Sequence, residues 1–371
     1  MAYIGENAHF SFRSGLCEAL PRTTVSSAEV AALGRTLTRF FGRFCVGCEG
    51  YSRLSTLYAL CSGISECGGE VCICESTDMP SFRFGLPLLS ADCGVFISGG
   101  SSLKIAFFDS RGFTLPQMRL TEIMRAEAPE PAERAGRISA MTSFGSIYLN
   151  NVRDTLRLSE PIPAGVSCGS RAVRGLWREL FTGEDDELVL QISDSGSRVN
   201  AYSTKYGFIS ADKLTLAYCI SAARAGDTVL LPDDFHYAAE LCSSLPEGAI
   251  LRYPAENGVP EVSGQSRFLR DPLYMCADLL RDREAFFALI SELPQISGAR
   301  REIAFTDAES YSKPKRLQTS KGRVIITRSG RNMLSVLAQT LSAETSAELC
   351  AEWCEKLRKA EKCRRRPESF M

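Results

Sequence analysis

The sequence predicts an α/β protein in which buried strands and helices alternate along the chain. Apolar and β-branched runs with the length of buried strands stand at 44–47, 70–74, 93–98 and 104–108. Segments with apolar residues at helical spacing lie between them, such as the segment 52–67, which ends before a pair of glycines. Because strands alternate with helices, we expect a largely parallel sheet covered by helices.

The helices and turns of this first part have recognisable ends. Ser26 is followed three residues later by Glu29, which is the spacing of a capping box, and apolar residues then recur at helical spacing. A short helix over 80–89 begins with Pro in its first turn. The residues 109–112 (Asp-Ser-Arg-Gly) have the composition of a tight turn after the fourth strand.

Composition and charge limit the classes of protein to consider. Of 371 residues, 44% are apolar and 23% are charged, as in an ordinary globular protein. The chain has 43 basic and 44 acidic residues and a net charge of −1, which argues against a general nucleic-acid or membrane-surface binder. No apolar run is long enough to span a membrane, and the first residues do not resemble a signal peptide. We therefore expect a cytoplasmic location.

The cysteines and histidines also indicate a cytoplasmic protein, and they do not indicate a zinc site. The chain has 15 Cys, an odd number, and several lie inside apolar runs, which indicates reduced thiols in a reducing compartment. Cys45 and Cys48 have the spacing of a zinc-binding pair, but no second pair stands at a suitable distance, so we expect no zinc site. The only two histidines, His9 and His236, are interpreted as surface or packing residues.

The rest of the chain continues as α/β and ends as α+β. The segment 126–137 is rich in Pro, Ala and charge and is interpreted as a linker. Further elements are expected from apolar runs and periodicity. They are a strand at 188–192, a turn near 206–207, a helix at 211–225, a strand at 228–231, a helix at 274–292, strands at 323–327 and 334–338, and an amphipathic helix at 343–360.

Several segments of the first part resemble a known family in their order and residues. Residues 45–53 (Cys-Val-Gly-Cys-Glu-Gly-Tyr-Ser-Arg), the Gly-Gly-Glu-Val at 68–71, and the segments 91–98 and 103–112 follow one another. They resemble the first domain of the α-D-phosphohexomutases, the phosphoglucomutases and phosphomannomutases, with their V-G-R-D-x-R and G-G-E-V segments. The resemblance covers most of the chain and is thin in residues 115–187.

This resemblance implies a fold of three related α/β domains, with mixed, largely parallel sheets, and a smaller C-terminal α+β domain. The expected boundaries are 1–125, 138–210, 211–298 and 299–371. The second of these domains is expected to be the most reduced, because the segment 150–187 is shorter than in the family.

Family members exchange a phosphoryl group between a phosphoserine and a sugar phosphate with the help of Mg²⁺. Their phosphoserine loop reads T-A-S-H-N-P and then N-G-I-K, whereas this chain has Ser-Gly-Gly-Ser-Ser-Leu-Lys at 98–104. Lys104 matches, the His-Asn-Pro is missing and the loop is shorter. The resemblance places Ser101 or Ser102 near the position of the nucleophile. The alternative is a plain Gly/Ser turn between two strands.

The metal loop of the family, D-G-D-A-D-R, is replaced by Ser-Asp-Ser-Gly-Ser-Arg at 193–198. Ser193, Ser195 and Ser197 stand at the three ligand positions, whereas Asp194 falls on a glycine position and is expected to point away from them. Arg198 is retained. Since Mg²⁺ prefers charged carboxylate oxygens, neutral hydroxyls are a poor substitute. The family implies Mg²⁺, but no metal or other cofactor is expected here.

Two further loops resemble substrate-binding loops of the family. The segment 260–265 stands where the sugar loop G-E-x-S-G-H is expected and keeps Glu261 and Ser263 as candidates for contacts with sugar hydroxyls. The segment 327–333 stands at the phosphate loop R-P-S-G-T-E-P. It keeps Ser329 and Gly330 and carries the cations Arg328 and Arg331, which could hold a phosphate. For both segments the alternative is an ordinary turn.

The sequence therefore leaves three functions open. The favoured hypothesis is a phosphohexomutase relative that has lost most or all mutase activity and still binds a hexose phosphate. The second is an active phosphomannomutase or phosphoglucomutase that uses Ser101 or Ser102. The third is a protein-interaction pseudoenzyme without a ligand, whose partner the sequence does not identify.

Overall fold

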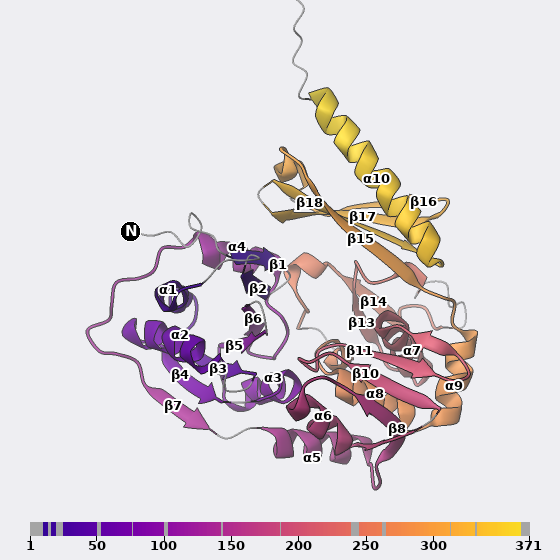
Figure 1. Ribbon diagram of the computed structural model, residues 1–371, viewed down its shortest axis with the longest axis horizontal. Helices are drawn as coiled ribbons and strands as arrows, with labels where there is room; N and C mark the ends of the chain where they lie inside the picture. The colour runs from indigo at the N-terminus through magenta and orange to yellow at the C-terminus, as the bar shows by residue number, and fades with distance from the viewer. Residues whose placement is uncertain are drawn as a thin grey trace, which may run out of the picture.

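The computed structural model is built from three bodies around the middle of the molecule (Figure 1). The first sheet and helices α1 to α4 form one body, the strands β8 to β14 with α5 to α9 form a second beside it, and the fourth sheet with α10 forms a third above them in this view. The structure describes residues 10–13, 16–19, 25–49, 53–75, 77–99, 103–141, 144–185, 187–238, 245–261, 265–311, 313–330 and 332–364.

The first sheet has seven strands within these residues, in the order β1-β2-β6-β5-β3-β4-β7. The strands β5, β3, β4 and β7 are parallel to one another, and β6, β2 and β1 pair antiparallel. Four of them confirm predicted strands. The bounds are β1 (Phe10–Arg13), β2 (Leu16–Ala19), β3 (Arg43–Cys48), β4 (Glu70–Cys74), β5 (Cys93–Ser98), β6 (Lys104–Asp109) and β7 (Ile138–Met141).

The helices of the first body are α1 (Ser27–Leu37), α2 (Leu54–Glu66), α3 (Met79–Leu88) and α4 (Gln117–Arg125). The predicted capping box is present, since the Glu29 amide donates to Ser26 Oγ at 3.2 Å and the Ser26 amide donates to Glu29 Oε2 at 2.7 Å. The helices α1 and α2 pack at very short range through Gly63, where a Cβ would lie 2.0 Å from the Ala31 carbonyl oxygen. Glycine is therefore required at this crossing.

The second body contains a five-stranded and a two-stranded sheet, as far as the structure describes the chain. The strand at 188–192 pairs parallel with its neighbour β8, as the predicted fold requires. The turn predicted near 206–207 joins two antiparallel strands. The strands are β8 (Ile162–Ser167), β9 (Phe181–Gly183), β10 (Leu188–Ile192), β11 (Val199–Ser203), β12 (Gly207–Ile209), β13 (Val229–Pro232) and β14 (Ile250–Tyr253).

The helices of this body share one hydrophobic core with both sheets, in which Trp177, Tyr218 and Phe286 are fully or almost fully buried. They are α5 (Gly145–Leu156), α6 (Arg171–Arg178), α7 (Ala211–Arg224), α8 (Pro272–Leu280) and α9 (Arg283–Glu292), with short 3₁₀ turns at η3 (Ala255–Asn257) and η4 (Arg267–Leu269). Within the described ranges the smallest sheet is the one formed by β13 and β14.

The prediction of one helix over 274–292 is wrong, because the structure has the two helices α8 and α9 there. Asp282 separates them. Its carboxylate accepts a hydrogen bond from the Ala285 amide at 3.0 Å and caps the second helix. The apolar periodicity runs through both helices, so periodicity alone does not reveal the break.

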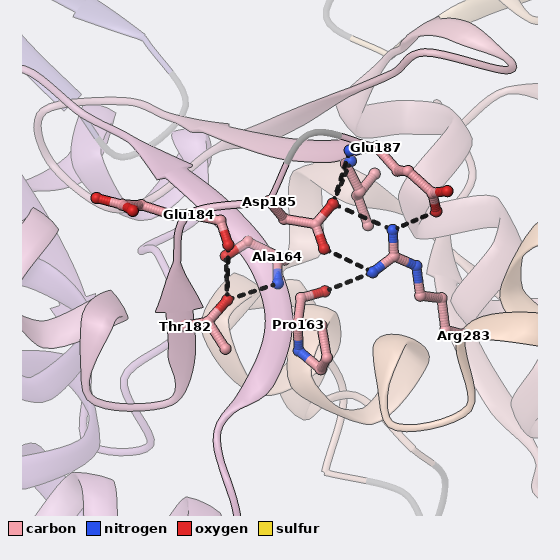
Figure 2. A network of polar contacts seen from close by, with 8 residues as sticks. Pro163, Ala164, Thr182, Glu184, Asp185, Glu187 and Arg283 are labelled. Carbon is pink, nitrogen blue, oxygen red and sulfur yellow. Dashed lines mark hydrogen bonds and ion pairs between the residues drawn. The ribbon is translucent and has the colours of Figure 1, made fainter.

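Figure 2 shows how α9 is tied to the loop between β9 and β10. The Arg283 guanidinium donates to both carboxylate oxygens of Asp185, at 2.7 and 3.1 Å, and to Glu187 Oε2 at 2.9 Å. A further hydrogen bond of 3.3 Å reaches the Pro163 carbonyl at the start of β8. The network therefore joins three segments that are far apart in the sequence.

The fourth sheet is antiparallel, with the order β15-β18-β17-β16 in the described part of the chain. Its strands are β15 (Ser297–Ala304), β16 (Lys315–Thr319), β17 (Gly322–Gly330) and β18 (Met333–Thr340), with η5 (Ala308–Tyr311) and the helix α10 (Ala343–Arg364). Leu349 and Cys350 of α10 pack on Val324 and Val336 of the sheet. Both predicted strands and the terminal helix are thus confirmed.

His236 lies where the second and third bodies meet. It is 5% exposed, its Nε2 lies 3.0 Å from the Thr340 carbonyl oxygen, and its Nδ1 accepts from the Ala238 amide. It is a packing residue, as expected, whereas His9 lies outside the described residues. None of the described helices is both long and apolar enough to cross a bilayer.

Candidate functional site

A cavity of about 220 Å³ lies between the first and second bodies. It opens where several parallel strands end, since Glu49 follows β3, Thr77 follows β4 and Asp194 follows β10. The carboxyl ends of parallel strands are where α/β folds place ligands. Both acidic and apolar side chains line it: Glu49, Thr77, Asp78, Met79, Phe96, Ser170, Ala172, Val173, Asp194 and Ser195.

The three serines at the expected metal positions come together beside this cavity. Ser193 Oγ lies 3.3 Å from Ser195 Oγ, and Ser195 Oγ lies 2.7 Å from Ser197 Oγ. The loop is closed by the Arg198 amide, which donates to Ser193 Oγ at 3.1 Å. A left-handed Gly196 with φ of 71° allows the tight turn. The alternating spacing seen in the sequence therefore produces one chain of hydroxyl groups.

This donor set does not fit Mg²⁺. Neutral hydroxyls supply none of the negative charge that a divalent cation needs, and here they satisfy one another. Among the residues that the structure describes, no three or more His, Cys, Asp or Glu side chains are grouped so that they could hold a metal ion.

Asp194 takes no part in the hydroxyl chain. Its Oδ1 accepts a hydrogen bond of 3.0 Å from the Ser170 amide, at the start of α6. Across the cavity lies Glu49, and burial raises the pKa of the Glu49 carboxyl, with a further rise from the negative charge of Asp194. Asp78 is occupied in capping α3, where it accepts from the Ser81 amide at 2.8 Å and from Ser81 Oγ at 2.6 Å. The acidic residues of the cavity therefore do not converge on one point.

The shortened phosphoserine loop is described only at its ends, and Ser101 and Ser102 lie outside the described residues. At the first end, Arg53 donates from Nε and Nη2 to the Gly99 carbonyl, at 2.9 and 2.6 Å. The Gly99 amide donates to Glu49, which acts against the rise in the pKa of that carboxyl. At the other end, Lys104 begins β6 and pairs with Ser98 of β5. Arg53 and Glu49 thus contact this loop; both lie in the segment 45–53 that carries the resemblance, but neither was predicted as a site residue.

The sugar-loop segment is described at Pro260, Glu261 and Gln265, and Ser263 lies outside the described residues. Glu261 is exposed. Gln265 stands at the family's histidine position, but its side chain donates to Asp227 at 3.2 Å and its backbone is held by β13. Of the two sugar-contacting candidates, Glu261 is therefore the one whose position is known.

The phosphate-loop segment forms the end of β17. The pairing of β17 with β18 shifts register between Arg328 and Gly330, which makes a bulge at Ser329. The Ser329 Oγ is shielded from solvent and has no hydrogen-bond partner among the described residues. A buried polar atom without a partner requires an explanation, and a ligand is one. Arg331 lies outside the described residues.

Arg198 lies on the surface at the end of the serine loop. Its guanidinium is 3.8 Å from Asp212 Oδ1 in the first turn of α7, and both side chains are more than half exposed. Such an exposed ion pair contributes little to stability. The side chain of Arg198 thus contacts α7, and its backbone, not its charge, supports the serine loop.

Comparison with solved structures identifies the fold. The chain superposes on a protein from Thermus thermophilus assigned provisionally as a phosphomannomutase, with a TM-score of 0.63 and 14% identity, over 95% of this chain and 99% of the other. It is similar to a phosphoglucomutase/phosphomannomutase family protein from Burkholderia thailandensis, with a TM-score of 0.66 and 14% identity, over 95% and 97% of the two chains. No model of a protein family matches, and no curated protein is similar in sequence. The chain thus has the phosphohexomutase fold.

Proposed function

We propose that this protein binds a hexose phosphate without catalysing metal-dependent phosphoryl transfer. The observation that carries the proposal is the chain of hydroxyl groups formed by Ser193, Ser195 and Ser197 in place of metal-binding carboxylates. The three serine hydroxyls are hydrogen-bonded to one another and thus have partners within their own loop. The similarity of the fold to a phosphoglucomutase/phosphomannomutase family protein supports the choice of ligand.

Transfer and binding have different requirements, so one can be lost while the other remains. Phosphoryl transfer needs a positioned nucleophile and cations that neutralise the transferring group. Phosphate binding needs only backbone amides, hydroxyls and guanidinium groups. The bulge at Ser329, with Arg328 beside it and a shielded hydroxyl that has no partner in the described chain, supports a retained phosphate site.

The test compares binding with turnover. Isothermal titration with glucose 1-phosphate or mannose 1-phosphate is expected to give saturable binding that is the same with Mg²⁺ and with EDTA. Phosphorus NMR is expected to detect no isomerisation of either sugar phosphate. Isomerisation that EDTA abolishes would contradict the proposal and favour an active mutase that uses Ser101 or Ser102.

A variant with three restored carboxylates, Ser193→Asp with Ser195→Asp and Ser197→Asp, provides the matched control. Because the three side chains already meet, this variant is expected to gain Mg²⁺ binding that the parent lacks. If the parent binds neither sugar phosphate, the interaction-only function is favoured instead.

A further inference from the structure

A rigid turn projects from the first body at the end of β6. The Asp109 Oδ1 accepts hydrogen bonds from the Arg111 amide at 3.0 Å and the Phe113 amide at 2.8 Å, so one carboxylate oxygen closes the turn. Gly112 has a φ of 81°, and a Cβ there would lie 2.4 Å from the Arg83 carbonyl oxygen. The turn is thus fixed from within and packed closely against α3.

Arg111 extends from this turn to the second body. Its Nε and Nη2 are held by Asp109 Oδ2 at 3.2 and 3.0 Å, which leaves the far side of the guanidinium free to reach across. There Nη2 donates to the Val259 carbonyl at 2.6 Å and Nη1 donates to the Pro260 carbonyl at 3.1 Å, across 148 and 149 residues of sequence. The planar fork therefore connects one carboxylate to two consecutive carbonyl groups.

The second body makes contacts in return. The Arg270 Nη1 donates to the Arg111 carbonyl oxygen. The guanidinium groups of Arg111 and Arg270 both lie over the Phe113 ring, at 5.2 and 5.3 Å from its centroid. From the first body itself, the buried Arg83 of α3 donates from Nε to the Gly112 carbonyl at 2.7 Å. The turn is therefore held on several sides, and Arg111 has one defined orientation.

The position of these two carbonyls decides what Arg111 does. Val259 and Pro260 come directly before Glu261, the one sugar-contacting candidate that the structure describes. We propose that Arg111 is a positioning residue, which fixes the segment 259–261 so that Glu261 can engage the hydroxyl groups of a hexose. This inference rests on the proposed function. It makes sugar recognition in the second body depend on a residue of the first, in addition to any contact with the phosphate.

Hydrogen–deuterium exchange tests the positioning without a ligand. Arg111→Ala is expected to speed exchange of the Val259 and Glu261 amides roughly tenfold, because two charge-assisted hydrogen bonds that restrain the segment are lost. Arg111→Lys keeps the charge and most of the stem, but a single ammonium does not reproduce the fork, so most of the increase is expected to remain. If Arg111→Ala does not fold, Arg111→Lys carries the same test.

Arg119→Ala is the matched control. Arg119 lies on α4 of the same body, pairs with Glu122 at 2.8 Å and stacks on Phe40, and none of these contacts reaches the second body. Its removal is expected to leave the exchange of the 259–261 segment unchanged. Unchanged exchange in Arg111→Ala as well would overturn the proposal.

Affinity separates positioning from a general structural role. The Arg111 variants are expected to bind glucose 1-phosphate or mannose 1-phosphate roughly tenfold more weakly while their affinity for inorganic phosphate stays the same. An equal loss of affinity for both probes would mean general destabilisation and would overturn the proposal. If the parent and the variants bind hexose phosphate with equal affinity, the proposed role of Arg111 is overturned, whereas the proposed function is not. A parent that binds no hexose phosphate would refute the proposed function and the role of Arg111 in sugar recognition together.

Discussion

Replacing Arg283 by Ala is expected to destabilise the second body through the network of Figure 2. The Arg283 and Asp185 side chains are only 24% and 12% exposed, and two hydrogen bonds of 2.7 and 3.1 Å join the charges. For a charge-assisted pair with this little exposure, we expect a loss of about 1.5–3 kcal/mol in the free energy of unfolding. The double variant with Asp185→Asn is expected to be less destabilised than the sum of the single variants.

The loss is expected to depend on pH with a definite sign. The Arg283 guanidinium, through its hydrogen bonds, lowers the pKa of the Asp185 carboxyl below its usual value. A carboxyl whose pKa is lower in the folded state stabilises the fold above its unfolded pKa of about 3.9. That contribution is lost as the pH falls through the lower pKa of the folded state. The difference between parent and Arg283→Ala should therefore be constant above about pH 5 and shrink below about pH 4.

Urea unfolding, followed by tryptophan fluorescence at each pH, measures the free energy of unfolding of the parent and the variants. The chain has two tryptophans. Trp177 is fully buried in the core of the second body, and Trp353 packs on the separate core of the fourth sheet, so a Trp353→Phe background reports on the second body alone. Arg224→Ala is the control, because its ion pair with Glu292 is about half exposed, and it should change stability by less than about 1 kcal/mol. A pH-independent difference between parent and Arg283→Ala, or strict additivity in the double variant, would refute the reasoning.

Three other predictions concern the loops and the packing. Titration of the parent with millimolar Mg²⁺ should show no saturable binding, and Ser195→Ala should leave that result unchanged; a change in Mg²⁺ affinity would make the serine loop functional. Arg331→Ala should weaken hexose phosphate binding about tenfold to a hundredfold, because an Arg–phosphate contact is charge-assisted, and equal affinity would remove Arg331 from the site. Gly63→Ala should lower the melting temperature or prevent folding, because its Cβ would lie 2.0 Å from the Ala31 carbonyl oxygen; an unchanged melting curve would contradict the close packing of α1 and α2.

Much of the fold is predictable from local signals. The capping box at Ser26, the strand at 188–192 and the turn near 206–207 follow from residues close in sequence, whose energetics do not require the rest of the chain. A local pattern also led to one wrong prediction, that of a single helix over 274–292. Periodicity does not reveal the break at Asp282, because the apolar pattern continues through it, although Asp is a good helix cap.

The candidate site is predictable only in part. Resemblance located the serine loop and the segments at 260–265 and 327–333, because their letters and order survive. Arg53, Glu49 and Arg111 lie in the segments 45–53 and 103–112 that carry the resemblance. They were not predicted as site residues, because they act through contacts with backbone groups or with a charge on another element. A backbone carbonyl has the same chemistry at every position, so the sequence around it does not reveal which side chain donates to it.

What the sequence by itself determined is the kind of elements, their order and the three serines at 193, 195 and 197. These depend on residue type and spacing, which are properties of the chain before it folds. Only the tertiary structure decided that the three serine hydroxyls meet, that Asp194 instead accepts from the Ser170 amide, and that Arg111 reaches Val259 across 148 residues. Periodicity specifies which face of an element is buried, but not what covers it, because that depends on how every other element packs at the same time.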